Sequence, residues 1–357
     1  MKFKKLLLGL TVFAAILYSC SSDSSSDSSA STPESVADAK QNITNTFNSF
    51  YNCLNTLDDG ELSNFILYSL FNSGNQDYND SWIKNLSNKF EGQYGKMFLN
   101  NKLQFANRAG VYVWNSTSQS WTKQAASNII TLRFPSRQNH SGNDAEFSLN
   151  AYNDTSVSYT SETYWLPTLV NFTLKRDNNL VFSLNASNIT FNVNTNFSMP
   201  TNADVVIYTA PYTHNFSWRR NSAVDFQLNY TSATPQGCTN SIVTNVKLKH
   251  SDYGNITSIS DVKTANGTVS VGDLKIVYAA NIEAITAYEN PTPAQINNNT
   301  NAEVYYNNAK IGNLIYDEVN GTTKIYIVYA DGTRENVDVY VGDFETKIRA
   351  IFENYLN

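Results

Sequence analysis

The chain has 357 residues, a hydrophobic fraction of 41% and a formal net charge of −6 at pH 7. Its basic groups, such as Arg219-Arg220 and Lys247-Leu248-Lys249, are scattered, so the sequence lacks the continuous positive surface that phosphate backbones require and we expect no nucleic-acid partner. The 22 Tyr and 19 Phe favour a sheet over a helical bundle.

Residues 1–19 have the pattern of a signal peptide. Lys2, Lys4 and Lys5 precede an apolar run from Leu6 to Tyr18. A helix of that length rises about 20 Å, which is well short of the ~30 Å hydrocarbon core of a bilayer. No later segment has eighteen consecutive apolar residues, so we do not expect an integral membrane protein.

The signal segment ends in Leu17-Tyr18-Ser19-Cys20, which resembles the lipobox of bacterial lipoproteins. The resemblance implies cleavage before Cys20, a thioether-linked diacylglycerol and an acyl chain such as palmitate on that cysteine, and a lipid bilayer as partner. Several acyl chains would anchor the protein more durably than a single one. The alternative is an ordinary secretory signal with an incidental cysteine.

Residues 20–32 are rich in Ser and Asp and are too polar to pack, so they predict a flexible tether. In Gram-negative lipoproteins an Asp directly after the cysteine retains the protein in the inner membrane, and Ser21 therefore implies the outer membrane. Asp23 and Asp27 are similar to the export tether of Bacteroidetes-type surface lipoproteins. Both the cell surface and the periplasmic face remain open as locations.

Residues 33–357 predict a single α+β body, with a large twisted antiparallel sheet, helices at the N-terminus and one C-terminal helix. The helical part covers residues 33–100. Its first helix begins at Thr32-Pro33-Glu34 and ends at Asp58-Asp59-Gly60. Further helices are expected from Leu62 to Phe71 and after Asp80.

Residues 101–290 predict a β-rich region. It opens with a hairpin, Val111 to Trp114 and Trp121 to Lys123, in which Trp114 faces Trp121. The turn Arg176-Asp177-Asn178-Asn179 closes another hairpin. The other strands are Ile129–Phe134, Glu146–Tyr152, Thr168–Lys175, Leu180–Asn185, Val205–Tyr208, Val224–Tyr230 and Ile242–Lys249. Asp273 to Glu289 fits a strand or a helix, and Pro291 to Asn301 reads as a loop.

Residues 291–357 predict four strands and a helix. Three strands cover Glu303–Tyr306, Leu314–Tyr316 and Lys324–Tyr329, a fourth contains the alternating Val337, Val339 and Val341, and the helix begins at Asp343. The chain as a whole is similar to Bacteroidetes-type outer-membrane lipoproteins in its Tyr/Trp hairpin, Phe134-Pro135 and Asp331-Gly332. That resemblance implies no reaction.

If Cys20 is acylated, Cys53 and Cys238 are the only cysteines that could pair, in an export compartment that permits disulfides. The alternative for Cys53 is a buried thiol on the apolar side of the first helix. The 49 Asn include many Asn-x-Ser/Thr triplets, which in a bacterial protein we attribute to compositional drift in polar loops.

Catalytic motifs are weak. His140, His214 and His250 show no metal-binding spacing, and the sequence has no Gly-x-Ser-x-Gly elbow or phosphate-binding loop, so we expect no metal and no cofactor. A glycoside hydrolase needs only two carboxylates, for which Asp144/Glu146 and Asp317-Glu318 are candidates. Acids in such places are ordinarily surface groups, which makes the hydrolase the least favoured function.

The aromatic strands suggest binding instead. Tyr112 and Trp114 are two residues apart and share one face of a strand, Trp121 extends that face, and Trp165 adds a further ring. Exposed rings of this kind stack on sugars, whereas buried ones are core packing. We expect a non-catalytic binding or scaffolding protein of the envelope with a glycan as ligand. The alternative is a carrier that encloses a lipid or other apolar ligand in a curved sheet.

Overall fold

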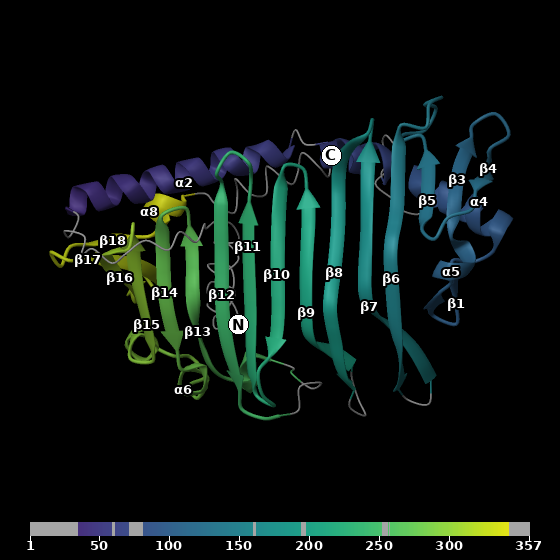
Figure 1. Ribbon diagram of the computed structural model, residues 1–357. Helices are drawn as coiled ribbons and strands as arrows, with labels where there is room; N and C mark the ends of the chain where they lie inside the picture. Colours follow the sequence, from purple (N-terminus) through teal and green to yellow (C-terminus); the bar gives the residue numbers. More distant parts are fainter. Residues whose placement is uncertain are drawn as a thin grey trace. The chain divides into compact units, whose positions relative to one another are not determined.

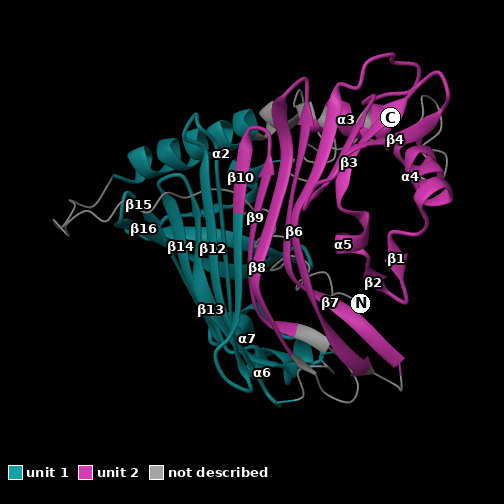
Figure 2. Ribbon diagram, turned by 45° about the vertical axis from the view of Figure 1, so that its right-hand side comes forward, with its two compact units in different colours: residues 1–54, 215–350 teal, residues 55–214, 351–357 magenta. Residues whose placement is uncertain are grey.

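The computed structural model describes residues 35–58, 61–70, 81–159, 162–193, 198–251, 256 and 258–342. The chain divides into two compact units (Figures 1 and 2). Unit 1 comprises residues 1–54 and 215–350, and unit 2 comprises residues 55–214 and 351–357. Unit 1 therefore joins the first helix to the C-terminal half of the chain, which differs from the sequence-ordered regions expected above.

The expected α+β class with a large, mainly antiparallel sheet is confirmed. Sixteen strands follow the order β18-β17-β16-β15-β14-β13-β12-β11-β10-β9-β8-β7-β6-β5-β3-β4, so nearly every strand pairs with its neighbour in the chain. The exception is a parallel pairing of β3 with β5, because β4 folds back onto the other side of β3. Within the described residues, no helix is both long and apolar enough to cross a membrane.

Unit 2 contains short helices and long strands. Its helices are α3 (Glu61–Ser69), α4 (Trp82–Tyr94) and α5 (Phe105–Arg108), and β1 (Phe98–Leu99) and β2 (Lys102–Leu103) form a separate two-stranded sheet. The strands of the large sheet are β3 (Gly110–Asn115), β4 (Ser120–Ala125), β5 (Ile130–Phe134), β6 (Ala145–Tyr159), β7 (Glu162–Arg176), β8 (Asn179–Val193) and β9 (Ser198–Thr209). The next strand, β10 (Tyr212–Arg220), begins in unit 2 and continues in unit 1.

The core of unit 2 lies between its helices and one face of β3 to β6. Ser81 caps α4 by accepting a hydrogen bond from the Lys84 backbone N–H, and the helix buries Leu86 and Phe90. These side chains join the aromatic rings of the β3–β4 hairpin in one hydrophobic cluster. Asp177 and Asn178 have φ values of 49° and 66°, so the predicted β7–β8 turn is confirmed.

Unit 1 is built on α2 (Val36–Asp58, of which the residues up to Leu54 belong to this unit). Its strands are β11 (Asp225–Ala233), β12 (Thr239–Leu248), β13 (Val262–Val271), β14 (Leu274–Ala280), β15 (Thr300–Tyr306), β16 (Ala309–Val319), β17 (Thr322–Tyr329) and β18 (Arg334–Asn336). The short helical segments are η3 (Ile259–Asp261), α6 (Ile282–Thr286), α7 (Pro293–Asn297) and α8 (Asp338–Val341).

The apolar stripe of α2 builds the core of unit 1. Ala39, Ile43, Phe47 and Phe50 repeat every three or four residues and are buried. They pack against one face of the sheet, in a cluster with Tyr230, Ile242, Val269, Ile276, Val304 and Ile327. Figure 2 shows α2 lying along the upper ends of the unit 1 strands. The other face of these strands is therefore not part of this core.

Several elements differ from expectation. The strands β10 and β13 were not predicted, because polar residues interrupt their apolar pattern: Thr, His, Asn and Arg in β10, and Thr, Asn and Gly in β13. Part of the loop expected after Pro291 is the helix α7, whose Thr292 and Gln295 form a capping box. Asp273 to Glu289 contains both a strand, β14, and a helix, α6.

The expected fourth strand through Val337, Val339 and Val341 is wrong. The strand β18 ends at Asn336, and the helix α8 follows. The Val337 N–H donates to the carbonyl of Ile325, so the chain bends over β17 and buries Val337 and Val341 while Val339 points to solvent. The helix expected from Asp343 lies outside the described residues.

Candidate functional site

The expected aromatic platform is buried. Tyr112, Trp114 and Trp121 are only 2%, 4% and 2% exposed. Trp114 and Trp121 do face each other across the hairpin, with ring centroids 5.5 Å apart. The position of the rings is as expected, but they do not present a face to solvent.

The helix α4 covers this platform. The Phe90 ring lies 5.0 Å from Tyr112 and 5.7 Å from Trp121, centroid to centroid. The Trp121 indole N–H donates to the carbonyl of Leu86 at 3.1 Å. A ring that is enclosed in this way cannot stack on a sugar. We therefore correct the binding expectation for Tyr112, Trp114 and Trp121 to a packing role.

Trp165 is half-buried and lies on β7. The Lys102 ammonium is 3.5 Å from the centroid of its ring, which is a close cation–π contact. Lys102 also pairs with Asp154 at 3.6 Å. One face of the Trp165 ring is thus occupied by a side chain of the protein itself.

The first acidic pair, Asp144 and Glu146, is engaged in structural contacts. The backbone N–H and the hydroxyl of Ser136 both donate to Asp144 at 2.7 Å. Burial would raise the pKa of Asp144, but these hydrogen bonds and His140 outweigh it and lower the pKa. Glu146 forms a 2.8 Å ion pair with Arg133. The lowered pKa of Asp144 is the opposite of what a general acid needs, and Glu146 is held by its ion pair.

The second acidic pair is also a surface feature. Asp317 forms a 2.7 Å ion pair with Arg334, and Glu318 is exposed. The three histidines lie apart, each with its own contacts: His140 with Asp144, His214 with Thr209 and His250 with Asp261. Burial lowers the pKa of His214. In the part of the chain that the structure describes, no group of three or more His, Cys, Asp and Glu could hold a metal ion.

The structure joins Cys53 on α2 to Cys238 in the β11–β12 turn by a disulfide, with a Cα–Cα distance of 6.3 Å. Both residues belong to unit 1. The Cys238 turn is fixed by a hydrogen bond from the Thr234 N–H to the Cys238 carbonyl. Cys20 lies outside the described residues.

The candidate site that the structure does favour is the sheet face of unit 1 opposite α2, here called the polar face. Strand pairing aligns its side chains in rows across β11 to β15. One row is Thr231, Ser241, Ser270, Lys275 and Tyr305; the second is Asn229, Val243, Thr268, Val277 and Glu303; the third is Gln227, Asn245, Asn266, Ala279 and Asn301. Only Lys275 and Glu303 in these rows are charged.

Neighbouring side chains of the polar face hydrogen-bond to one another. The Asn245 amide donates to Asn266 at 3.3 Å, and the Asn229 amide donates to Ser217 of β10 at 3.1 Å. Glu303 accepts from Tyr305 and from Lys310, and these hydrogen bonds lower its pKa. The face therefore offers amides and hydroxyls in fixed positions, with the one carboxylate already paired and with Ser241 and Ser270 buried at 8% exposure each.

The two faces of these strands differ because strand residues alternate between them. Between the rows of the polar face stand side chains that turn towards α2, for example Val269 and Ile276. The Thr244 and Tyr278 hydroxyls meet at 2.8 Å across Gly267, where an added Cβ would lie 1.8 Å from the Val243 carbonyl oxygen. A glycine is needed at this position because of the close approach.

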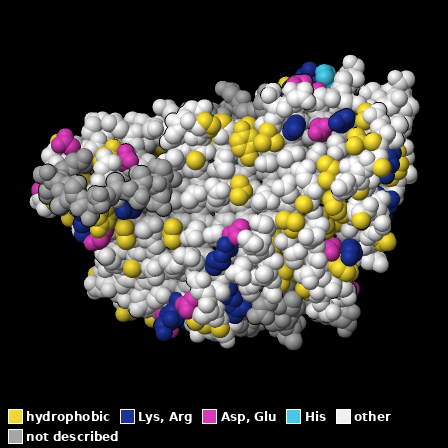
Figure 3. Space-filling model, in the orientation of Figure 1, with side chains coloured by type: hydrophobic (Ala, Val, Ile, Leu, Met, Phe, Trp, Pro, Cys, Tyr) yellow, Lys and Arg dark blue, Asp and Glu magenta, His cyan; other side chains and the backbone are white. Residues whose placement is uncertain are grey.

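Unit 2 carries a similar array on its long strands. The Asn150 amide donates to Asn171 at 2.9 Å, and the Asn171 amide donates to Asn185 at 3.1 Å. These three residues lie on β6, β7 and β8, so the asparagine ladder crosses three strands. In the view of Figure 3, most of the visible surface is neither hydrophobic nor charged.

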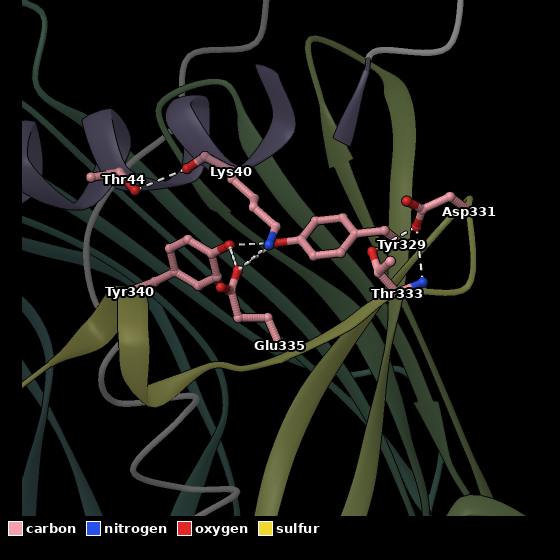
Figure 4. A network of polar contacts seen from close by, with 7 residues as sticks. All are labelled: Lys40, Thr44, Tyr329, Asp331, Thr333, Glu335 and Tyr340. Carbon is pink, nitrogen blue, oxygen red and sulfur yellow. Dashed lines mark hydrogen bonds and ion pairs between the residues drawn. The ribbon is translucent and has the colours of Figure 1, made fainter. Parts of the chain in front are cut away.

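A separate polar cluster ties α2 to the last strands of unit 1 (Figure 4). Lys40 pairs with Glu335 at 3.2 Å, and Glu335 also accepts a hydrogen bond from Tyr340, whose hydroxyl contacts that of Tyr329. Burial raises the pKa of Tyr329 to about 12 and also raises that of Tyr340. The members come from distant parts of the chain, so no sequence spacing indicated them.

The polar face was likewise missed by the sequence analysis. Its asparagines were attributed to drift in loops, yet many occupy strands, where Asn is disfavoured. The signal was present as polar residues alternating with apolar ones, for example in Gln227, Asn229 and Thr231 of β11. No family model, curated protein or solved structure matches this chain.

Proposed function

We propose that this protein is a lipid-anchored envelope protein, acylated at Cys20, that binds neutral glycan without catalysis on the polar face of unit 1. The observation that carries the binding proposal is the contrast between the two faces of β11 to β15. One face carries α2 and its apolar core cluster, and the other presents aligned rows in which most side chains are uncharged amides and hydroxyls.

The chemistry of the polar face fits a polyol better than an anion. A phosphate or carboxylate polymer is held by Lys and Arg, and Lys275 is the only cation in the rows. Strands lie about 4.8 Å apart, and side chains on one face recur about 6.6 Å along a strand. Such a grid can offer donors and acceptors to several hydroxyls at once. Tyr305 adds an aromatic ring at one end of a row.

The alternative carrier function needs an open apolar concavity, and in unit 1 the side chains of α2 pack on the part of the apolar face nearest the upper strand ends. The hydrolase alternative loses support because Asp144, Glu146 and Asp317 all have structural partners. The anchor and the outer-membrane location rest on the lipobox and on Ser21. The Cys53–Cys238 disulfide fits a chain that folds in an oxidising compartment outside the cytoplasm.

The binding proposal is tested with an acyl-free Cys20→Ser protein and a panel of polysaccharides in affinity gel electrophoresis. Dextran, xyloglucan, laminarin and starch are the neutral polymers, and alginate is the anionic comparison. We expect retardation by at least one neutral polymer. The Asn245→Ala/Asn266→Ala variant should bind it about thirtyfold more weakly, because two hydrogen bonds of ~1 kcal/mol each are removed.

The matched control is Asn85→Ala/Asn88→Ala, which removes two exposed asparagines of α4 in unit 2. It should bind as the parent protein does. The proposal is contradicted if no neutral polymer retards the protein, or if the variants of the polar face and of α4 behave alike.

A further inference from the structure

A second surface, in unit 2, combines exposed apolar side chains with positive charge. Phe98 and Leu99 on β1 are 56% and 57% exposed, which places them among the most exposed large hydrophobic residues that the structure describes. They are adjacent in sequence at the tip of the β1–β2 hairpin. The turn residues Asn100 and Asn101 have φ values of 48° and 62°, as a two-residue hairpin turn requires.

The hairpin is held in place at its base. Leu103 is buried in a cluster with Ile130 and Leu149 of the large sheet. The Gln104 N–H donates to the Met97 carbonyl at 2.8 Å. The hairpin is therefore fixed to the large sheet through Leu103. Phe98 and Leu99 take no part in that core contact and stay exposed.

The charge around the hairpin is opposite to that of the whole chain. Residues 92–143 contain no Asp or Glu, although the full chain has a net charge of −6. Lys96 and Lys102 flank the tip, and the Arg108 guanidinium donates to the Lys96 carbonyl at 3.3 Å. Lys123 of β4 reaches the end of α5, where its ammonium donates to the Ala109 carbonyl at 2.9 Å. Lys96 and Arg108 thus lie close to two exposed apolar side chains, whereas Lys102 is held by Asp154 and the Trp165 ring.

We propose that the β1–β2 hairpin docks on an anionic lipid bilayer, with Phe98 and Leu99 inserted at the interface and Lys96 and Arg108 against the headgroups. Shallow insertion of apolar side chains together with cations near the surface is how peripheral proteins bind such membranes. A neutral glycan has no charge that would be attracted to these cations, so it is a less suitable ligand for this surface. The docking depends neither on acylation of Cys20 nor on the polar face.

The test uses the acyl-free Cys20→Ser protein and cosedimentation with vesicles. One set of vesicles is pure phosphatidylcholine, and the other is an equal mixture of phosphatidylcholine and phosphatidylglycerol. We expect binding to the anionic vesicles at 50 mM NaCl, a much smaller bound fraction at 500 mM NaCl, and little binding to the neutral vesicles, because headgroup attraction is screened by salt.

Phe98→Ser/Leu99→Ser should weaken vesicle binding by about tenfold or more, because both apolar side chains are removed from the inserted tip. Lys96→Gln should weaken it by a few-fold. The control is Val339→Ser, since Val339 is 65% exposed but lies on α8 of unit 1. All variants should keep the far-ultraviolet circular dichroism spectrum of the parent and any polysaccharide affinity that the parent shows.

Absence of binding to the anionic vesicles would overturn the docking proposal, as would equal binding by the parent and Phe98→Ser/Leu99→Ser. Binding that depends on charge but not on Phe98 and Leu99 would also overturn it, because insertion would then play no part. None of these outcomes affects the glycan test, whose binding residues Asn245 and Asn266 lie in unit 1.

Discussion

Asparagine has two separate structural roles in this chain. In hairpin turns, Asn307 and Asn308 have φ values of 48° and 63°, a conformation that Asn tolerates better than most residues. In strands, Asn171 and Asn185 bond to each other across the sheet. The abundance of Asn therefore reflects strand and turn chemistry together, and drift in loops does not account for it.

Glu335 illustrates how a half-buried carboxyl sets a pH dependence of stability. Burial would raise its pKa, but hydrogen bonds from Tyr340 and Lys40 outweigh burial, so its pKa is lower in the folded chain than the unfolded value of about 4.3. A carboxyl of this kind stabilises the fold above its unfolded pKa, and that contribution is lost as the pH falls through the folded pKa.

We expect Glu335→Gln to lower the free energy of unfolding by about 1 kcal/mol at pH 7, because a charged hydrogen-bond acceptor is lost. The difference from the parent should shrink when urea unfolding is repeated at pH 3.5. The exposed Glu289→Gln serves as the control and should match the parent at both pH values. A difference for Glu335→Gln that is as large at pH 3.5 as at pH 7 would contradict the assigned pKa shift.

At the scale of elements, α2 determines which face of the unit 1 sheet is available. Its apolar stripe covers the face that contains Ile242 and Val304, and its amphipathic spacing was evident in the sequence. The edge strand β4 is covered differently. Gln93 and Tyr94 of α4 accept from the backbone N–H groups of Trp121 and Lys123, which blocks further strand pairing there.

The disulfide fixes one end of α2 to the β11–β12 turn across a sequence separation of 185 residues. In the chain-entropy model, a disulfide that closes such a loop lowers the entropy of the unfolded chain and raises the free energy of unfolding by up to about 5 kcal/mol. We expect Cys53→Ser/Cys238→Ser to lower the free energy of unfolding by about 2–5 kcal/mol in urea.

Reduction provides the internal control for this prediction. Dithiothreitol should bring the acyl-free Cys20→Ser parent to the stability of the double variant and should leave the double variant unchanged. If reduction does not alter the parent, the two cysteines are not joined in the folded protein.

For the whole molecule, the most direct prediction concerns the anchor. Cys20→Ala should abolish metabolic labelling by a palmitate analogue and move the protein from the membrane fraction to the soluble fraction at high salt, because the acyl chains are lost. High salt is needed because the β1–β2 hairpin would retain some protein on anionic membranes at low salt. Labelling that persists in Cys20→Ala would show that the acylation site lies elsewhere.

Sequence alone determined the class of fold and the order of most elements. Period-two and period-3.6 patterns are local, so the Trp114–Trp121 hairpin and the helix α2 could both be predicted. The strand β13 was not predicted because Thr, Asn and Gly weaken its local hydrophobic pattern. Its pairing with β12 stabilises it as a strand, although the strand propensity of Asn and Gly is low.

What only the tertiary structure decided is which side of each element meets the core. Tyr112, Trp114 and Trp121 share a strand face whether they are exposed or buried, and α4 closes that face from a different part of the chain. The polar rows likewise arise only when five strands are set in register. Alternation along a strand separates two faces, but contacts between distant segments decide which face is left for a ligand.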